Sequence, residues 1–149
     1  MSHPPWRIRP MVPSDHAACL RVWTACEHLG DPPTLAALER FLHHNPAFSQ
    51  VAEVVGGTMA EPDTTSPVIA AVLVSSDGIR GYIYRLGVHP SHRRQGIATA
   101  LVQAAQHALT ADGCDRTNLH LFSVNVAAQD FWRGQGFAPT AGLEFWSRR

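Results

Sequence analysis

The hydrophobic positions of this chain change period several times, and each period predicts a type of element. Residues 6–9 alternate in polarity, which is typical of a short strand. Residues 68–74 are continuously apolar, which predicts a strand covered on both faces. Residues 82–88 follow a Ser-Ser-Asp-Gly turn and predict a further strand. Other strands are expected at residues 48–55, at residues 116–124 and as a hairpin-like pair between residues 137 and 146.

Apolar residues at helical spacing predict helices between these strands. The first runs from about residue 14 to residue 28, with Ser14 or Asp15 as its cap, and a Gly-Asp-Pro-Pro stretch ends it. The other helices are expected at residues 34–43, with Thr34 as cap, at 95–110 and at 126–133. The resulting order, βααβββαβαβ(β), is a mixed α/β arrangement, and 149 residues are the usual length of one domain.

The stretch GVHPSHRRQGIATALVQAAQ, residues 87–106, joins a strand to a helix and carries the first chemical signal. A helix beginning near Gln95 leaves its first N–H groups without partners inside the helix, and its dipole adds partial positive charge there. Gly96 and Ala98 keep the backbone accessible, and Arg93 and Arg94 add fixed charge. These features predict a diphosphate-binding site. The alternative is an exposed basic turn in which Gly96 only helps the chain to bend.

Two other phosphate motifs are excluded, because neither G-K-[ST] nor a three-glycine dinucleotide fingerprint is present. LGVHPSHRRQGIATALV instead resembles the acetyl-CoA-binding motif of the GNAT superfamily of N-acetyltransferases, [RQ]-x-x-G-x-[GA], with Arg93, Gly96 and Ala98 at its places. NVAAQDFWRGQGF resembles that family's later block N-x-x-A-x-x-F-Y-x-x-x-G-F. IRPMVPSDHAACLRVW resembles its first strand and helix.

The resemblance covers nearly the whole chain, with the loop at residues 58–67 as the main insertion. It implies an α/β (α+β) fold. In that fold a mixed, mostly antiparallel central sheet of about six to seven strands is flanked by about four helices, and its middle strands splay apart. Residues 1–149 are then a single N-acetyltransferase domain.

The resemblance also implies an acetyl-CoA site. The strand backbone at Leu86, Gly87 and Val88 would pair with the pantetheine arm, and the Val88 N–H would hold the thioester carbonyl oxygen as an oxyanion donor. Asn125 would reach the same arm. The remaining cosubstrate-binding residues implied by the resemblance are Arg93, Arg94, Gln95, Gly96, Ile97, Ala98 and Thr99 at the diphosphate, and Phe131 and Trp132 beside the arm.

Acetyl transfer to an amine by direct attack in a ternary complex requires the amine to be neutral. A lysine-like amine of pKa ~10.4 is neutral in only ~1 molecule in 2,500 at pH 7, a penalty of about 4.6 kcal/mol. His120 is a candidate general base, because imidazoles titrate near neutral pH, and lining of the acceptor pocket is its alternative role. Tyr84, Tyr82 and Asp77 are further candidates; lining is the simpler role for the two tyrosines, which share one strand face.

Trp132 stands where the family often has a tyrosine that is proposed to protonate the departing thiolate. An indole N–H donates a hydrogen bond but is no acid at useful pH. Because a thiol of pKa ~8.5 is already a fair leaving group, we expect an active enzyme without a tyrosine acid. A non-catalytic acyl-CoA-binding or sensing module is the alternative, although the intact segment 88–98 favours an enzyme.

The resemblance implies acetyl-CoA and an amine acceptor as partners, and composition argues against other classes of partner. Twelve basic and twelve acidic side chains cancel, which argues against a nucleic-acid partner. No secretory signal or apolar run of membrane-spanning length is present, so no membrane partner and a cytoplasmic location are expected. No Cys or His cluster has metal-ligand spacing, so no metal is expected.

The cysteines and the C-terminal segment add further expectations. Cys19, Cys26 and Cys114 are expected to be reduced thiols, with Cys19 and Cys26 facing the core from one helix. A C-terminal strand at residues 143–146 would be able to pair with a second chain, giving a homodimer. The identity of the amine acceptor has no recognisable code in the sequence.

Overall fold

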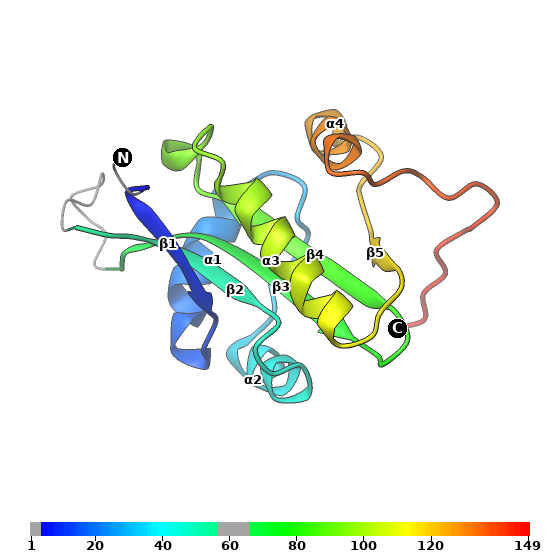
Figure 1. Ribbon diagram of the computed structural model, residues 1–149, viewed down its shortest axis with the longest axis horizontal. Helices are drawn as coiled ribbons and strands as arrows, with labels where there is room; N and C mark the ends of the chain where they lie inside the picture. The colour runs from blue at the N-terminus through cyan, green and yellow to red at the C-terminus, as the bar shows by residue number, and fades with distance from the viewer. Residues whose placement is uncertain (1–3, 57–65) are drawn as a thin grey trace.

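The computed structural model describes residues 4–56 and 66–149. Residues 58–65 of the expected surface loop lie outside the described residues. In the described part the elements follow one another as strand, two helices, three strands, helix, strand and helix (Figure 1). The bounds are β1 Trp6–Pro10, α1 His16–Thr24, α2 Leu35–His44, β2 Gln50–Val54, β3 Val68–Ser76, β4 Gly81–Val88, α3 Ile97–Ala111, β5 Thr117–Leu119 and α4 Val126–Gly134, with short 3₁₀ turns at Pro13–Asp15 and Pro90–His92.

The strands of the described residues form one sheet in the order β1-β2-β3-β4-β5. Neighbours from β1 to β4 are antiparallel, and β4 and β5 are parallel. The parallel pairing is short, because it joins Gly81, Tyr82 and Ile83 to residues 117–119 and then ends. Beyond Ile83, β4 continues to Val88 without a partner from β5, which ends at Leu119.

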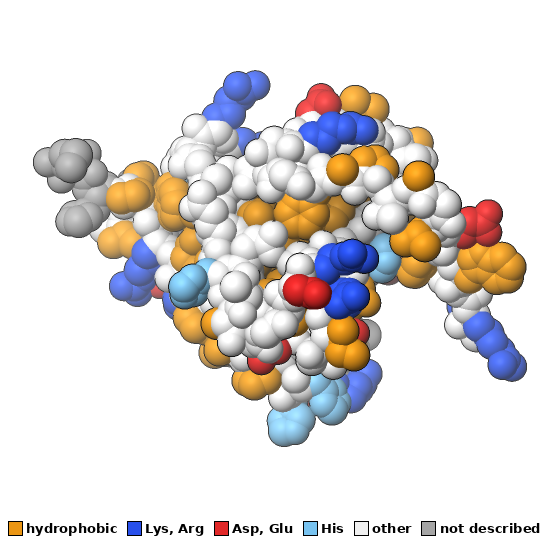
Figure 2. Space-filling model, turned by 45° about the vertical axis from the view of Figure 1, so that its right-hand side comes forward, with side chains coloured by type: hydrophobic (Ala, Val, Ile, Leu, Met, Phe, Trp, Pro, Cys, Tyr) orange, Lys and Arg blue, Asp and Glu red, His pale blue; other side chains and the backbone are white. Residues whose placement is uncertain are grey.

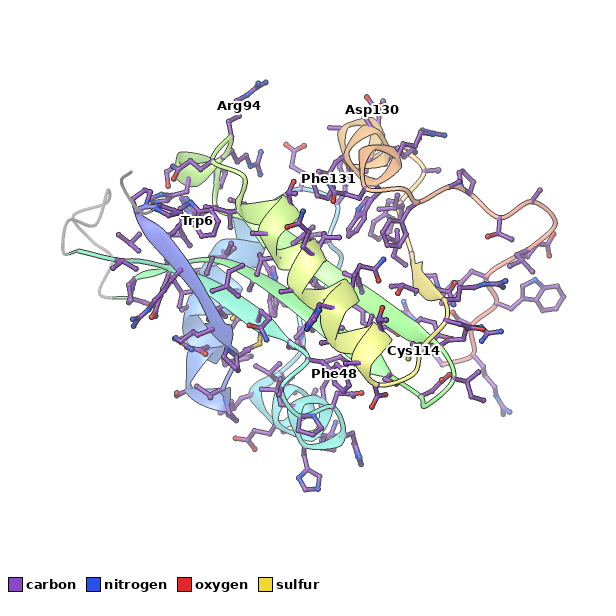
Figure 3. The ribbon with its side chains drawn as sticks, in the orientation of Figure 1. Trp6, Phe48, Arg94, Cys114, Asp130 and Phe131 are labelled. Carbon is purple, nitrogen blue, oxygen red and sulfur yellow. The ribbon has the colours of Figure 1, made fainter. Side chains whose placement is uncertain are left out.

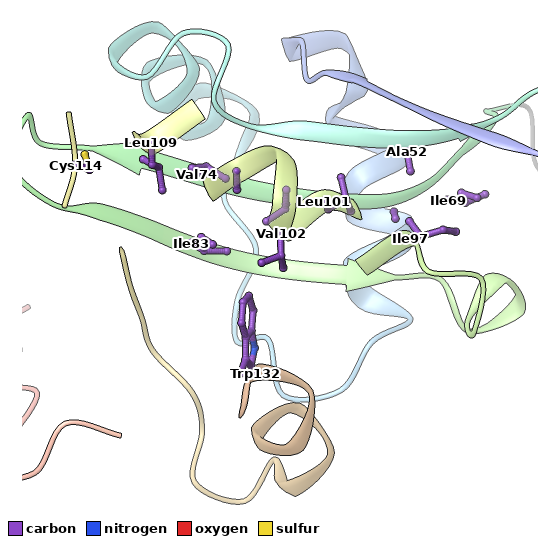
Figure 4. Packing of buried hydrophobic residues seen from close by; sticks show 13 residues of the cluster. Ala52, Ile69, Val74, Ile83, Ile97, Leu101, Val102, Leu109, Cys114 and Trp132 are labelled. Carbon is purple, nitrogen blue, oxygen red and sulfur yellow. The ribbon is translucent and has the colours of Figure 1, made fainter. Parts of the chain in front are cut away.

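Helices cover both faces of this sheet. The helix α3 lies along one face, and α1 with α2 covers the other (Figure 1). As the apolar run predicted, β3 lies between them with residues 68–74 buried. Figure 4 shows Leu101, Val102 and Leu109 of α3 packed toward Val74 and Ile83. Leu101 and Leu109 have almost no exposed surface, and truncating such a leucine to alanine costs about 2–5 kcal/mol.

Two predicted elements are corrected by the structure. The strand expected at residues 116–124 is confined to β5, so His120 lies just after the strand and not in its middle. The hairpin-like pair expected between residues 137 and 146 is absent: this segment holds neither helix nor strand and is exposed. The sheet of the described residues therefore has five strands and not six to seven. Alternating polarity alone does not make a strand, because a strand also needs a partner edge.

The first helix is shorter than predicted. It ends at Thr24, and it could not extend to residue 28 as predicted, because His28 has a left-handed backbone conformation that no right-handed helix can contain. Cys19 is buried in α1 as expected, but Cys26 lies beyond the helix and does not face the core from it. Thr34 caps α2 as predicted, since its side chain accepts a hydrogen bond from the Ala37 N–H at 3.2 Å.

Candidate active site

A β-bulge in β4 determines which side chains reach the candidate site. Tyr84 pairs with Leu73, but Gly87 pairs with Ala71, so β4 has one residue more than β3 in this interval. Arg85 takes up the extra length with a left-handed φ of 50°. Tyr84 thus faces α1 and α2, while Leu86 and Val88 pack on the α3 side.

The backbone of β4 offers hydrogen-bonding groups along its open edge. The His89 N–H donates to the Ile69 carbonyl of β3 at 2.8 Å. Because successive backbone groups of a strand point to opposite edges, the N–H and carbonyl of Val88 point away from β3. Arg93 Nε reaches the Val88 carbonyl from that side at 3.3 Å, and Cys26 Sγ lies 3.5 Å from it. In the described chain, β5 does not pair with this part of β4.

The N-terminus of α3 borders the same opening. Gly96 precedes the helix with a left-handed φ of 78°, and a Cβ built on it would meet no atom within 4 Å. The first N–H groups of α3 have no carbonyl four residues earlier in the helix to accept from them. Arg94 is also left-handed, at φ 62°, and its side chain extends outward from the loop (Figure 3). The site therefore combines exposed donors, open space and positive charge.

The helix α4 forms the opposite wall. Asn125 caps it, since the Asn125 side-chain oxygen accepts from the Ala128 N–H at 3.2 Å. Phe131 points from α4 toward α3 (Figure 3). Trp132 is 6% exposed, and its ring packs edge-on against Phe131 and Phe137 at centroid distances of 5.2 and 5.1 Å. Its indole extends from α4 toward Ile83 and Val102 (Figure 4), so it fills space between the parted strands.

These parts enclose an open cleft of about 750 Å³, visible in Figure 2 as a hollow with a hydrophobic floor. It brings together most of the predicted residues, but Gln95 and the candidate bases Tyr82 and Asp77 do not line it. The predicted residues that line it are Tyr84, Leu86, Gly87, Val88, Arg93, Arg94, Gly96, Ile97, Ala98, Thr99, His120, Asn125, Phe131 and Trp132.

The candidate bases differ in their surroundings. Burial raises the pKa of Tyr84, so its phenol is neutral at pH 7. Asp77 closes the turn before β4: its carboxylate accepts from the Arg80 and Ile79 N–H groups at 2.7 and 2.8 Å, and these bonds lower its pKa. Tyr82 stacks on Tyr84, as their shared strand face predicted. The exposed His120 ring lies 6.4 Å from that of Tyr84 and lines the cleft.

Sequence reasoning missed the contribution of the segment between α1 and α2. Arg85 Nη1 donates to the Leu29 carbonyl at 2.8 Å, and its guanidinium lies 5.5 Å from the Trp23 ring. A Cβ on Gly87 would lie 3.1 Å from both Cys26 Sγ and Trp23 Cδ1, so β4 and this segment touch through bare backbone. The one signal of this contact in the sequence is Gly87, because a glycine in a strand allows another segment to lie close to the backbone.

The three cysteines are free thiols. Burial raises the pKa of Cys19 to about 12, which makes it unreactive. Among the described residues, no group of three or more His, Cys, Asp or Glu side chains is placed to hold a metal ion. In the same part of the chain, every helix is too short or too polar to cross a membrane.

Residues 10–137 match the Acetyltransferase (GNAT) family. An acetyltransferase of Sodalis glossinidius is 36% identical over 123 residues, which cover 80% of this chain and 78% of that protein. The chain belongs to the GNAT acetyltransferase family. Membership supports acyl transfer as its general reaction.

Solved structures share the GNAT fold. Ard1 from Thermoplasma volcanium superposes with a TM-score of 0.76 at 22% identity, covering 92% of this chain and 85% of that one. A chain of the NatC complex bound to Gag peptide and CoA gives a TM-score of 0.72 at 23% identity, covering 91% of this chain and 86% of that one. At these identities the likeness establishes the mixed α/β fold of this GNAT protein and nothing finer.

Proposed function

We propose that this protein is an N-acetyltransferase that transfers the acetyl group of acetyl-CoA to a primary amine of a small molecule or peptide. The observation that carries the proposal is the junction of two features in one cleft. One is the open edge of β4 at Val88, and the other is the exposed start of α3 at Gly96. The β4 edge can form hydrogen bonds with the amides of a pantetheine arm, and the start of α3 can bind a diphosphate.

The residues present fit acetyl-CoA. The open space at Gly96 lets phosphate oxygens approach the first amides of α3, and Arg93 and Arg94 supply positive charge. The edge of β4 at Leu86 and Val88 would pair with the pantetheine amides. Phe131 and Trp132 would pack beside that arm, and the Asn125 side-chain amide nitrogen would reach it, because the oxygen is occupied by the α4 cap. The family likeness and a CoA-bound structural neighbour support this assignment.

The reaction proceeds by direct attack in a ternary complex. The neutral amine nitrogen forms a bond to the thioester carbon, and the carbonyl oxygen takes up negative charge that the Val88 N–H stabilises. Collapse of this intermediate breaks the carbon–sulfur bond and releases CoA as a thiolate. The proton lost by the amine passes to a base, and the thiolate is protonated from solvent.

His120 is the base that we propose, acting directly or through water. The Asp77 carboxylate already accepts hydrogen bonds from two N–H groups of its own turn. The raised pKa of Tyr84 keeps its phenol protonated at neutral pH, so it can donate a hydrogen bond but does not act as a base. The His120 ring is exposed on the cleft lining, where it can accept a proton. The buried Trp132 would act by packing and not as an acid.

The test combines cosubstrate binding with turnover. Titration calorimetry with acetyl-CoA and CoA measures binding, and thiol release with a panel of amines and peptides measures transfer. The chain has twelve arginines and no lysine, so its side chains carry no amine to be acetylated in the assay. We expect binding of both CoA forms and amine-dependent thiol release. Absence of CoA binding would overturn the proposal, and binding without release for any amine would favour the sensing module.

A further inference from the structure

Five aromatic rings from separate parts of the chain lie next to one another in series, and we call this series the aromatic wall. The Tyr82 and Tyr84 rings of β4 are stacked 6.0 Å apart at 13°. Phe41 of α2 meets Tyr84 edge-on at 6.2 Å, and His120 lies 6.4 Å from Tyr84. Phe145 of the C-terminal segment closes the series, because its ring is 4.5 Å from that of His120.

The aromatic wall is continuous with the cleft. Tyr84 and His120 line the cleft where β4 and β5 begin to part, next to the last paired residues Ile83 and Leu119. Val88 lies four residues farther along β4, but the bulge at Arg85 leaves only three strand steps between Tyr84 and Val88, which their partners Leu73 and Ala70 on β3 mark, or about 10 Å. A molecule that brings an amine to a thioester held at Val88 therefore has the aromatic wall beside it.

Charge in the cleft disfavours an acceptor with several amines. Glu27 is the one carboxylate among the described residues that line it, and its side chain is 92% exposed. Arg85, Arg93 and Arg94 line the same cleft. With acetyl-CoA bound, Arg93 and Arg94 face its diphosphate, so the discrimination comes from the missing carboxylates. A polycation would lose the hydration of several ammonium groups without a buried carboxylate to bind them, whereas an acceptor with one ammonium group would lose little.

Phe145 is distinguished from its neighbours by its contact. Leu143, Phe145 and Trp146 are all highly exposed, at 75%, 74% and 84%. Phe145 lies against His120, while the Trp146 indole N–H donates to Glu144 on its own segment. The exposed face of Phe145 can pack against a ligand held beside His120. Leu143 provides a matched control, because it is equally exposed and belongs to no described ring contact.

We infer that the amine acceptor carries an aromatic or planar apolar group near a single amine, and that this group packs on Tyr84, His120 and Phe145. This inference rests on the proposed acetyl transfer and names the acceptor class for the same cleft. Affinity for the ring comes from apolar contact and from the offset or edge-on packing that aromatic pairs prefer.

The experiment compares acceptors at saturating acetyl-CoA. Phenethylamine and tryptamine represent aromatic monoamines, n-hexylamine an aliphatic one, and spermidine and kanamycin polycations. Two peptides that differ only in an N-terminal Phe or Ser test whether the aromatic group of the acceptor can be the side chain of a peptide's first residue. We expect kcat/KM for aromatic monoamines to be at least tenfold higher than for n-hexylamine. The difference between aromatic monoamines and the polycations should be larger still. Preference for spermidine or kanamycin would overturn the inference.

Variants locate the effect. We expect Phe145→Ala to raise the acceptor KM about three- to tenfold for phenethylamine and to leave n-hexylamine and the Kd of acetyl-CoA unchanged. Leu143→Ala should match the wild type with every acceptor. Equal behaviour of the two variants would contradict the inference.

A measurement without turnover separates this inference from the proposed function. Calorimetric titration of phenethylamine into the CoA-loaded protein should give tighter binding than n-hexylamine. If acetyl-CoA binds but the two amines bind equally or not at all, the acceptor inference alone fails. If acetyl-CoA does not bind, the proposed function fails with it.

Discussion

The two ends of the cleft are built in different ways. The end at Gly96 and Val88 presents mainly the backbone groups of one short stretch of chain, residues 86–99, with α4 as its opposite wall. The end at Tyr84 and His120 uses side chains from α2, β4, the residue after β5 and the C-terminal segment. Backbone donors held by local structure suit a ligand part that does not change, such as a diphosphate. Side chains collected from distant segments suit the part of the reaction that sets specificity.

This difference makes the two ends separable by mutation. Changes at the Gly96 end should alter cosubstrate affinity with every acceptor. Changes at the His120 end should alter turnover or acceptor choice and leave cosubstrate affinity intact. The predictions below run from the largest expected effect to the smallest.

Replacement of His120 should have the largest effect. We expect His120→Gln to lower kcat about 100-fold or more, because a positioned base contributes about 10²–10⁴ to the rate. The Kd of acetyl-CoA from calorimetry should stay within twofold of the wild type. A kcat within fivefold of the wild type would show that His120 lines the pocket and that proton removal occurs elsewhere.

Replacement of Gly96 should act on the other end. Gly96→Val places a side chain where phosphate oxygens would approach and strains a left-handed residue. We expect at least a tenfold rise in the Kd of acetyl-CoA, equal to about 1.4 kcal/mol. Gly113→Val is the control, since Gly113 is also left-handed, with open space around it, but lies outside the cleft. A similar loss of affinity in both variants would mean that strain alone is responsible.

The stability of the fold at acid pH should depend on a network of charged residues that lies outside both ends of the cleft. Burial raises the pKa of Glu53 and Asp15, but hydrogen bonds from arginines outweigh it. Arg7 and Arg9 bind Glu53, Arg9 binds Asp15, and the net pKa shift of both acids is downward. A lowered pKa contributes stability above the ordinary values of 3.8 and 4.5, and this contribution is lost as the pH falls below them.

Glu53→Gln tests this network. We expect it to lower the Tm at pH 7 by about 3 °C and to flatten the fall of Tm between pH 6 and pH 3. Thermal unfolding at several pH values measures both effects. Acetyl-CoA binding at pH 7 should be unchanged, and a changed Kd would contradict the separation of this network from the cleft.

The smallest effect should follow Trp132→Tyr. If leaving-group protonation does not limit the rate, a tyrosine acid has little to add, and kcat should stay within about threefold of the wild type. Some stability should be lost, because the smaller ring leaves space among Phe131, Phe137 and Ile83. A rise in kcat of tenfold or more would show that protonation of the thiolate limits this enzyme.

The Gly96 end could be predicted from sequence because its chemistry is local. A strand, a glycine and the start of a helix follow one another within residues 86–99, and the orphan amides belong to any helix start. The buried strand at residues 68–74 and the Thr34 cap were predictable for the same reason: apolar runs and caps act over a few residues.

The His120 end could not be predicted in this way. The left-handed Arg85, the contact of Cys26 with the β4 edge and the position of Phe145 beside His120 join residues that are tens of positions apart. The wrong prediction of strands between residues 137 and 146 has the same origin, because strand formation depends on an available partner edge.

The sequence by itself therefore determined the family, the order of most elements and the position of the turn that we propose to bind the cosubstrate. Each of these depends on backbone geometry and periodicity over short stretches. The tertiary structure decided where the sheet ends, how far β4 and β5 pair and which rings meet at His120. These features arise from packing between distant segments, whose free energy depends on surfaces that meet only when the chain has folded.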